Sequence, residues 1–251
     1  MKRKLEISEL IFKIISYTLL TIFAVCCLYP FLYAISASIS GRHAVEYNDL
    51  ILFPKDIQFD AFSKMFNDNM FWNAYTNTLF ITFYGTIWAL FTSIFGAYAL
   101  SKKRLLFRKG FNFFLVFTMW FSAGLVPQYL NYLDTKRVFN AVGIMDDKWL
   151  VVIAMGMAAM NIILLRNSFE GVPSEIEEAA IVDGATEMQV LWRVYIPMSK
   201  SIIATVALFF GISRWNGYFW ARQMISNSNE HPLQVFIRLK LEQYTDPEQM
   251  A

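Results

Sequence analysis

Long apolar runs separated by short polar segments dominate the chain and predict membrane-spanning helices. The hydrocarbon core of a bilayer requires about 20 apolar residues in a helix, and five runs approach or reach that length. They lie at about Ile11 to Ser36, Tyr75 to Leu100, Phe111 to Leu130, Trp149 to Leu165, and Ser201 to Phe219. We therefore predict an all-α, polytopic membrane protein with five spans, whose residues 1–251 form a single transmembrane domain.

Positive charge collects at two places along the chain and predicts its orientation. The segment Lys2 to Lys4 precedes the first run, and Lys102 to Lys109, between the second and third runs, carries basic residues without acids. Basic flanks stay on the cytoplasmic side of a membrane, so we expect both segments, and hence the N-terminus, to be cytoplasmic. The segments Gly41 to Phe71 and Asn131 to Lys148 then lie outside, and residues 166–200 return inside.

The first run also admits a second interpretation, a cleaved signal peptide. Its basic start resembles that of a signal sequence, but its apolar part is longer than the about 7 to 15 residues of a signal core, and further spans follow. We interpret the run as an uncleaved anchor, with cleavage near Ala34 or Ala37 as the alternative.

Two short helices are predicted between the fourth and fifth runs from their capping patterns. Ser174 is followed three residues later by Glu177, and Thr186 is followed three residues later by Gln189. A hydroxyl residue with Glu or Gln at this spacing forms a capping box, which satisfies the free amides that open a helix. The pattern predicts a helical hairpin within residues 166–200.

Gly and Pro predict where these two helices stop. The first is expected to run from about Glu175 to Asp183 and to end at Gly184, because Gly adopts the left-handed conformation past a helix end most easily. The second is expected to end before Pro197, which cannot continue a helix.

One face of the first predicted helix is suited to close contact with another surface. Four residues spaced three or four apart share it: Ile176, Ala179, Ala180 and Asp183. Three flanking carboxylates offer charge to the basic groups of a partner: Glu175, Glu177 and Glu187. A solvated hairpin that only links two spans is the alternative.

Composition narrows the class of protein in the same direction. Hydrophobic residues make up 56% of the chain and charged residues 17%, against about 25% charged in a soluble domain. The net charge is only +2, and no long basic run is interleaved with aromatic residues, so a nucleic-acid partner is not expected.

The sequence contains no motif typical of catalysis or metal binding. Its two histidines, His43 and His231, fall in predicted outside loops, and CxxC, HExxH and GxSxG patterns do not occur. Cys26 and Cys27 are interpreted as small packing residues in the first run. A phosphate-binding GxxxxGK[ST] loop is missing too, so we expect no cofactor or metal in this chain and no enzymatic activity of its own.

Several polar residues within or beside the spans are candidates for lining a solute path. Arg214 lies inside the fifth run next to Trp215 and Asn216. A mid-membrane Arg costs roughly 2.5 to 3.5 kcal/mol, so it should face a polar path or a partner, unless it snorkels to the outer interface. Asn161 in the fourth run is a further candidate for the path or for a bond between helices.

The outer end of the third run is interrupted by Gly124 and Pro127. Interrupted helices are tolerated in membranes where they line a cavity. Three neighbouring polar residues are therefore candidates for an outer gate or a docking surface: Gln128, Asn131 and Tyr132. An ordinary exit from a helix into a loop is the alternative.

The predicted hairpin carries a motif that extends over both of its helices. Glu178-Ala179-Ala180 is followed after three residues by Gly184, and after nine more by Val194-Tyr195-Ile196-Pro197. This order resembles the motif of ABC-importer permeases, with Val194 and Ile196 in place of the family's usual isoleucine and leucine. The resemblance implies that residues 174–197 couple the chain to a separate ATPase. The coupling residues it implies are Glu178, Ala179, Ala180, Asp183, Gly184 and Pro197.

Further segments resemble carbohydrate-uptake permeases of the maltose-transporter type, above all the branch that imports oligosaccharides or sugar-acid polymers. They are Phe121 to Tyr132, Arg193 to Lys200, Trp215-Asn216 and His231 to Arg238. The resemblance implies a type I ABC importer permease in a bacterial cytoplasmic (inner) membrane. It also implies four partners: a second homologous permease, an ATPase dimer that binds ATP and Mg, an extracytoplasmic solute-binding protein, and an oligosaccharide substrate.

The resembled permeases cross the membrane a sixth time, and this sequence has no sixth run. We expect that the sequence is incomplete at its C-terminus, with a departure from the family as the alternative. An ABC permease for a non-sugar solute and a non-transport scaffold or membrane enzyme are the rival functions. The lack of paired ionisable groups within the spans argues against an enzyme, and the cost of Arg214 argues against a scaffold.

Overall fold

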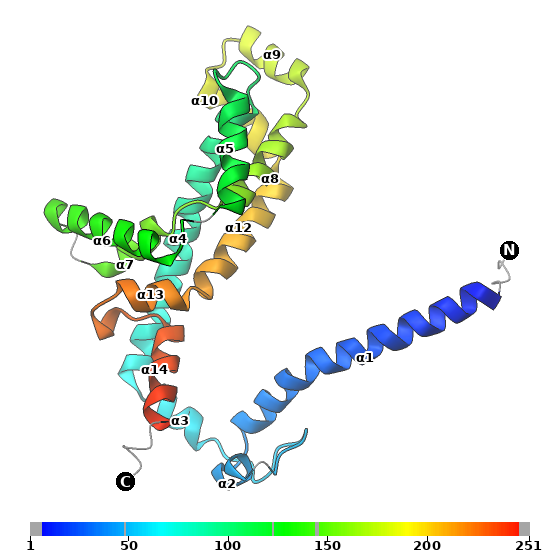
Figure 1. Ribbon diagram of the computed structural model, residues 1–251, viewed down its shortest axis with the longest axis vertical. Coiled ribbons are helices and arrows are strands. Elements are labelled where there is room, and N and C mark those ends of the chain that lie inside the picture. The colour runs from blue at the N-terminus through cyan, green and yellow to red at the C-terminus, as the bar shows by residue number, and fades with distance from the viewer. Residues whose placement is uncertain (1–6, 48, 122, 144–145, 246–251) are drawn as a thin grey trace. The chain divides into compact units, whose positions relative to one another are not determined.

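The computed structural model describes residues 7–47, 49–121, 123–143 and 146–245. These residues form helices joined by short connections, without a strand among them, as Figure 1 shows. The chain divides into two compact units, Met1–Asp68 and Asn69–Ala251. The all-α prediction is confirmed for the described part of the chain, and the single-domain prediction remains a prediction.

The first unit is built around one long apolar helix. α1 (Ile7–Ser38) has 32 residues and contains an 18-residue stretch with a mean hydropathy of 2.1, so it is long and apolar enough to cross a membrane. The following segment folds on itself: the Gly41 amide donates to the Lys55 carbonyl and the Gln58 amide to the Ile39 carbonyl, each at 3.0 Å. It contains two short helices, α2 (Arg42–Glu46) and α3 (Asp60–Phe66). The basic residues Lys2 to Lys4 lie outside the described range.

The second unit is organised around α4 (Asn69–Ser101), which packs against α7 (Asp147–Ala154), α8 (Ala159–Glu170) and α12 (Lys200–Trp215). Every fourth residue along one face of α4 is small and buried: Gly85, Ala89, Ser93, Ala97 and Ser101. Residues four apart lie above one another on a helix, and small side chains let neighbouring membrane helices approach closely. This face therefore allows close packing at the centre of the unit.

The third, fourth and fifth predicted spans are not straight helices. The third run divides into α5 (Arg108–Trp120) and α6 (Leu125–Val142), and the fourth into α7 and α8, which meet at a 51° bend. In α12 the fifth run ends at Trp215, four residues before the predicted Phe219. By length and composition α1 and α4 can cross a membrane alone, and up to five spans result if each bent pair counts as one.

A short helical segment after α12 returns to α4. It consists of α13 (Tyr218–Met224), the 3-10 turn η2 (Ser228–Glu230) and α14 (Leu233–Thr245). The Asn77 side chain on α4 donates to the Asn229 carbonyl at 2.8 Å, and the Thr78 hydroxyl accepts from the Leu233 amide at 2.7 Å. The polar side chains of α4 thus hold the connection that leads into α14.

The hairpin lies at the opposite end of this unit from α14 (Figure 1). It begins with α9 (Ser174–Val182) and continues with α10 (Glu187–Val190), a π-helical turn η1 (Leu191–Tyr195) and α11 (Ile196–Met198). Buried residues of α10 and η1, including Val190, Leu191 and Tyr195, join a core with α4, α8 and α12. The hairpin is therefore packed onto the helices that carry the rest of the unit.

Two details of the predicted hairpin are wrong. Pro173, not Ser174, occupies the N-cap of α9, and no side-chain cap bond forms there, because the proline side chain has no oxygen to accept one. The Glu177 carboxylate binds Lys102 and Tyr195 instead. The second helix continues through Pro197 to Met198. Pro197 has no amide to donate, and the preceding π turn, in which the Ile196 amide bonds to the Leu191 carbonyl five residues back, keeps the chain helical without that bond.

Two predictions of local structure in the hairpin, the second capping box and the stop at Gly184, are confirmed. Thr186 and Gln189 form a reciprocal capping box at the start of α10. Gly184 has φ +83° and follows the end of α9. The Gly184 amide donates to the Ile181 carbonyl at 2.9 Å and the Ala185 amide to the Ala180 carbonyl at 3.0 Å, a Schellman pair that closes the helix.

Candidate functional site

Most of the predicted coupling residues are exposed on the hairpin. Glu178 and Ala179 on α9 are exposed, and so are Asp183 and Gly184, which directly follow that helix. Ala180 is half-buried and packs against the core below. A hollow of about 340 Å³ lies between the two arms of the hairpin, lined by residues that include Ala180, Asp183 and Gly184. A polar partner can therefore approach this face without displacing the core.

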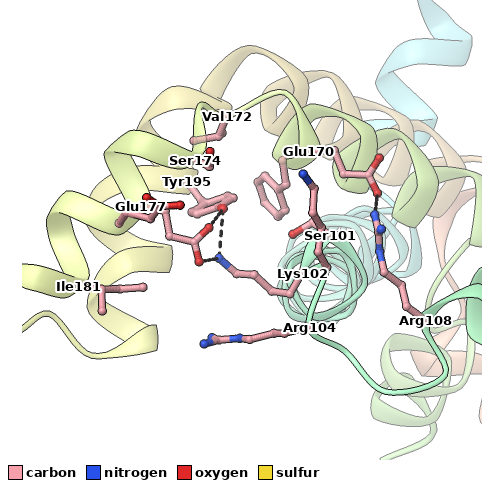
Figure 2. A pocket seen from close by; sticks show the side chains of 13 residues that line it. Ser101, Lys102, Arg104, Arg108, Glu170, Val172, Ser174, Glu177, Ile181 and Tyr195 are labelled. Atoms are coloured by element: carbon pink, nitrogen blue, oxygen red, sulfur yellow. Dashed lines mark hydrogen bonds and ion pairs between the residues drawn. The ribbon is translucent and has the colours of Figure 1, made fainter.

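A buried lysine holds the inner face of α9. Lys102 follows the last residue of α4, and its Nζ donates to Glu177 Oε1 at 2.6 Å and to the Tyr195 hydroxyl at 3.1 Å. The Tyr195 hydroxyl in turn donates to the other oxygen of Glu177. The Lys102 ammonium also lies 4.3 Å and 4.1 Å from the ring centres of Tyr98 and Tyr195, a distance at which cation–π attraction acts. Figure 2 shows Lys102 reaching from the end of α4 to Glu177 and Tyr195.

Two further ion pairs connect the segment after α4 to the hairpin region. Arg104 pairs with Glu187 at the start of α10, where the Tyr98 hydroxyl also donates to the Glu187 carboxylate at 2.8 Å. Arg108 pairs with Glu170 at the end of α8 (Figure 2). The Arg104 pair is exposed, with side-chain exposures of 62% and 48%, so it contributes less than the Lys102 pair.

These residues surround a cavity of about 680 Å³ between the loop after α4 and the inner side of α9. Its charged lining includes four basic side chains, Lys102, Lys103, Arg104 and Arg108, and three carboxylates, Glu170, Glu177 and Glu178. Most of these charges are paired with one another. The arrangement is suited to holding elements together and to polar docking.

The charge state of Glu177 follows from its partners. Burial alone would raise the pKa of the Glu177 carboxyl, but hydrogen bonds from Lys102 and Tyr195 outweigh burial and hold the pKa below its usual 4.5. Glu177 is therefore ionised at neutral pH, and its contact with Lys102 is a true ion pair.

Two carboxylates have other partners than the sequence predicts. Glu177 and Glu187, predicted to offer charge to another protein, both bind basic groups of this chain, Lys102 and Arg104. The basic segment after α4 therefore binds the hairpin, in addition to its predicted role in orientation. A sequence does not show which of several lysines and glutamates 75 positions apart will meet, so the Lys102–Glu177 pair could not be found from the pattern.

Arg214 is buried against α4 and the break between α7 and α8. Its side chain is 5% exposed, and Nη2 donates to the Gly156 carbonyl at 2.9 Å, in the break between α7 and α8. A Cβ at Gly85 on α4 would lie 3.1 Å from Arg214 Cδ, so the arginine packs directly on this glycine. Arg214 is thus buried among the helices of this unit with a backbone carbonyl as its partner, and its role beside a solute path remains a prediction.

The other candidate path residues fall into two groups. Tyr132 and Asn161 are buried, at 5% and 7% exposure. Four are exposed: Gln128, Asn131, Trp215 and Asn216. Gln128 Nε2 donates to the Tyr132 hydroxyl at 3.3 Å, and the Tyr132 ring packs edge-on against Trp220 with centroids 4.8 Å apart. The described contacts thus join Gln128 to Tyr132, and a role of these residues in a solute path remains a prediction.

The described part of the chain contains no cluster of metal-binding side chains. No group of three or more His, Cys, Asp or Glu side chains in that part of the chain is placed to hold a metal ion. Cys26 and Cys27 on α1 are both free thiols.

The fold defines the class of protein as a helical, polytopic membrane protein. It has long apolar helices, bent helix pairs packed on a central helix, and a capped hairpin at one end. Within that class the chain belongs to the family of binding-protein-dependent transport system inner membrane components, which matches residues 6–248. It is therefore a membrane transport component.

Individual relatives extend this assignment. The chain is 32% identical over 228 residues to the polygalacturonan/rhamnogalacturonan transport system permease protein YtcP of Bacillus subtilis, covering 91% of this chain and 77% of the relative. It is 26% identical to the galactooligosaccharides transport system permease protein GanQ of the same organism, covering 77% and 68%.

A solved structure shows the same fold. A chain in the crystal structure of a bacterial ABC transporter involved in the import of the acidic polysaccharide alginate matches with a TM-score of 0.88 and 41% identity, covering 99% of this chain and 86% of that one. The predicted type I ABC importer permease fold is thereby confirmed.

Proposed function

We propose that this chain is the permease subunit of an ATP-driven importer of oligosaccharides, with polymers or oligomers of sugar acids as the preferred class. The observation that carries the proposal is the 41% identity over 99% of the chain to a transporter of an acidic polysaccharide. Relatives named for polygalacturonan and galactooligosaccharides support saccharides as the wider class.

The chain would form half of the translocation path, with its N-terminus in the cytoplasm. A second homologous permease would complete the path, and a solute-binding protein would deliver the saccharide from outside. ATP and Mg would be bound by a dimer of ATPase subunits. These partners follow from the kind of system to which the family belongs.

In this proposal residues 174–197 form the coupling site. The exposed residues Glu178, Ala179, Asp183 and Gly184 offer the face that the ATPase would contact. Pro197, at the start of α11, lies where the hairpin leads into α12. Because the hairpin is packed onto the core of α4, α8 and α12, movement of its outer face would be passed to those helices.

The exposed polar and aromatic residues Gln128, Asn131, Trp215 and Asn216 would contact the saccharide. Buried Tyr132, Asn161 and Arg214 would shape the path by fixing the helices around it. Aromatic rings and amides suit this task, because sugars offer both apolar ring faces and hydroxyl groups.

Uptake by the reconstituted importer tests the proposed substrate class. The permease pair, ATPases and binding protein would be placed in liposomes and offered labelled oligogalacturonides, oligoalginates, neutral maltodextrins and a peptide. We expect ATP-dependent uptake of at least one acidic oligosaccharide, with weaker uptake of the neutral one. Uptake of the peptide alone would overturn the saccharide assignment.

A further inference from the structure

The environment of Lys102 differs from that of the other basic residues in its loop. Lys102 is 9% exposed, whereas Lys103 and Arg104 beside it are exposed. Lysine is almost never fully buried unless it is paired. The Lys102 ammonium meets a carboxylate at 2.6 Å, a hydroxyl at 3.1 Å and two tyrosine rings within 4.3 Å. A lysine that served only to keep the loop after α4 on the cytoplasmic side would need none of these contacts.

Three elements meet at this ammonium. Tyr98 and Lys102 lie at the end of α4, Glu177 lies on α9, and Tyr195 lies in the π turn η1. The side-chain contacts therefore tie the central helix to both arms of the hairpin at one point. The Tyr98 and Tyr195 rings also pack edge-on, with centroids 5.1 Å apart.

Glu177 and its neighbour Glu178 differ in exposure, although both line the cavity on the inner side of α9. The Glu177 carboxylate is bound by Lys102, whereas Glu178 is exposed and open to approach by the ATPase. Adjacent residues on an α-helix are about 100° apart, as follows from 3.6 residues per turn. One turn of α9 thus carries both an exposed carboxylate and a tie to α4.

From this geometry we infer that Lys102 is a positioning residue that transmits displacement of α9 into α4. The inference rests on the proposed coupling function of the hairpin. Displacement of α9 by the ATPase would move Glu177. The Lys102 ammonium, which is bound to Glu177 and Tyr195, would transmit that movement to the end of α4. Because α4 packs on α7, α8 and α12, the displacement would reach the helices proposed to surround the path.

The Arg104–Glu187 pair provides a matched control. It joins the same loop to the other arm of the hairpin, but both side chains are largely exposed. Solvent screens such a pair and leaves it free to rearrange. Loss of Arg104 is therefore expected to leave transmission intact, while loss of Lys102 is not.

The test compares Lys102→Met with Arg104→Met in the complete reconstituted importer. The readout is the number of saccharide molecules taken up per ATP hydrolysed, measured together with copurification of the ATPase. Coupling between sites is typically worth about 5- to 150-fold, so we expect Lys102→Met to lower this ratio at least about fivefold while the ATPase still copurifies. Arg104→Met should stay within about twofold of wild type, and Lys102→Arg, which keeps the charge, should recover most of the ratio.

An unchanged ratio in Lys102→Met would overturn the inference. If Lys102→Met does not insert into the membrane, Tyr195→Phe is the deciding variant, because it removes one hydroxyl that contacts the Lys102 ammonium and keeps the ring. A lowered ratio in Tyr195→Phe supports the inference, and an unchanged ratio contradicts it. Failure of the proposed function looks different, since the wild-type assembly itself would then take up no saccharide.

Discussion

The backbone at Gly184 connects the two arms of the hairpin in a conformation that few other residues adopt. Its φ of +83° lies in the left-handed region, yet no atom lies within 4 Å of the position where a Cβ would stand. A side chain there would meet open space, so the only penalty is backbone strain, about 1 to 2 kcal/mol for a residue with a Cβ. Gly184 is needed for the path of the chain, not for room.

Replacement of Gly184 by Val is expected to uncouple transport from ATP hydrolysis without preventing insertion. A β-branched residue strains the left-handed turn and tilts α9 away from α10, while the core beneath is untouched. Gly184→Asn is the matched control, because Asn tolerates this conformation. Uptake and ATPase rates of both variants check the prediction, which fails if Val and Asn behave alike.

Arg214 illustrates a buried charge held by the backbone. It lies between Gly85 on α4 and the Gly156 carbonyl at the break of α7 and α8. A cation near the carbonyl end of a helix interacts favourably with the helix dipole. The residue therefore holds the bent pair α7–α8 against the central helix.

A double-mutant cycle tests this packing. We expect Gly85→Val to destabilise the protein by about 1 to 3 kcal/mol, as overpacking usually does, because the added side chain meets Arg214. In an Arg214→Ala background the same change should cost much less, since the space is then free. Thermal unfolding in detergent measures both costs, and equal costs would show that the two positions do not interact.

At the scale of elements, the apolar runs predict where helices lie, and Gly124 predicts the break before α6. The runs depend only on composition within a window, and bilayer thickness sets their length. The bends between α7 and α8 and before α12 could not be predicted in this way, because residues far away in the sequence contribute to them: the Arg214 side chain, for example, binds the Gly156 carbonyl. The sequence shows small residues at every fourth position of α4, but their burial comes from the structure.

Within the hairpin the local signals were partly sufficient. Thr186 with Gln189 and Gly184 act through neighbouring backbone groups, and both predictions were correct. Ser174 with Glu177 shows the same pattern, but Lys102 takes the glutamate away from the helix start. A capping pattern therefore fails where a tertiary ion pair competes for its acid.

The tie between α9 and α4 should be insensitive to pH in the physiological range. The pKa of Glu177 in the folded protein lies below its usual 4.5. A carboxyl with a lowered pKa stabilises the fold above its unfolded-state pKa, and this contribution is lost as pH falls through the folded pKa. The stabilisation is thus complete from about pH 8 down to about pH 5.5 and declines below about 4.5.

The difference in thermal midpoint between wild type and Glu177→Gln measures this contribution. We expect the difference to be constant between about pH 8 and 5.5 and to shrink in more acid solution. A difference that already vanished near pH 6 would mean that the carboxyl titrates at a higher pH than its partners imply.

At the scale of the whole molecule, fold class and family were accessible from the sequence. Apolar composition indicated a membrane protein, and one spaced motif pointed to the permease family that matches residues 6–248. The tie through Lys102 was not accessible, because it joins residues that are distant in the chain and individually ordinary. The outer face of the hairpin was predicted, and its inner connection came from the structure.

The central claim is that the hairpin receives the ATPase, and site-directed cross-linking tests it most directly. In a background with Cys26→Ser and Cys27→Ser, a cysteine would be introduced at exposed Glu178 on α9 or, as a control, at exposed Asn140 on α6. We expect Glu178→Cys to cross-link to the ATPase in the assembled complex and Asn140→Cys not to do so. Cross-linking from Asn140→Cys, with none from Glu178→Cys, would contradict it.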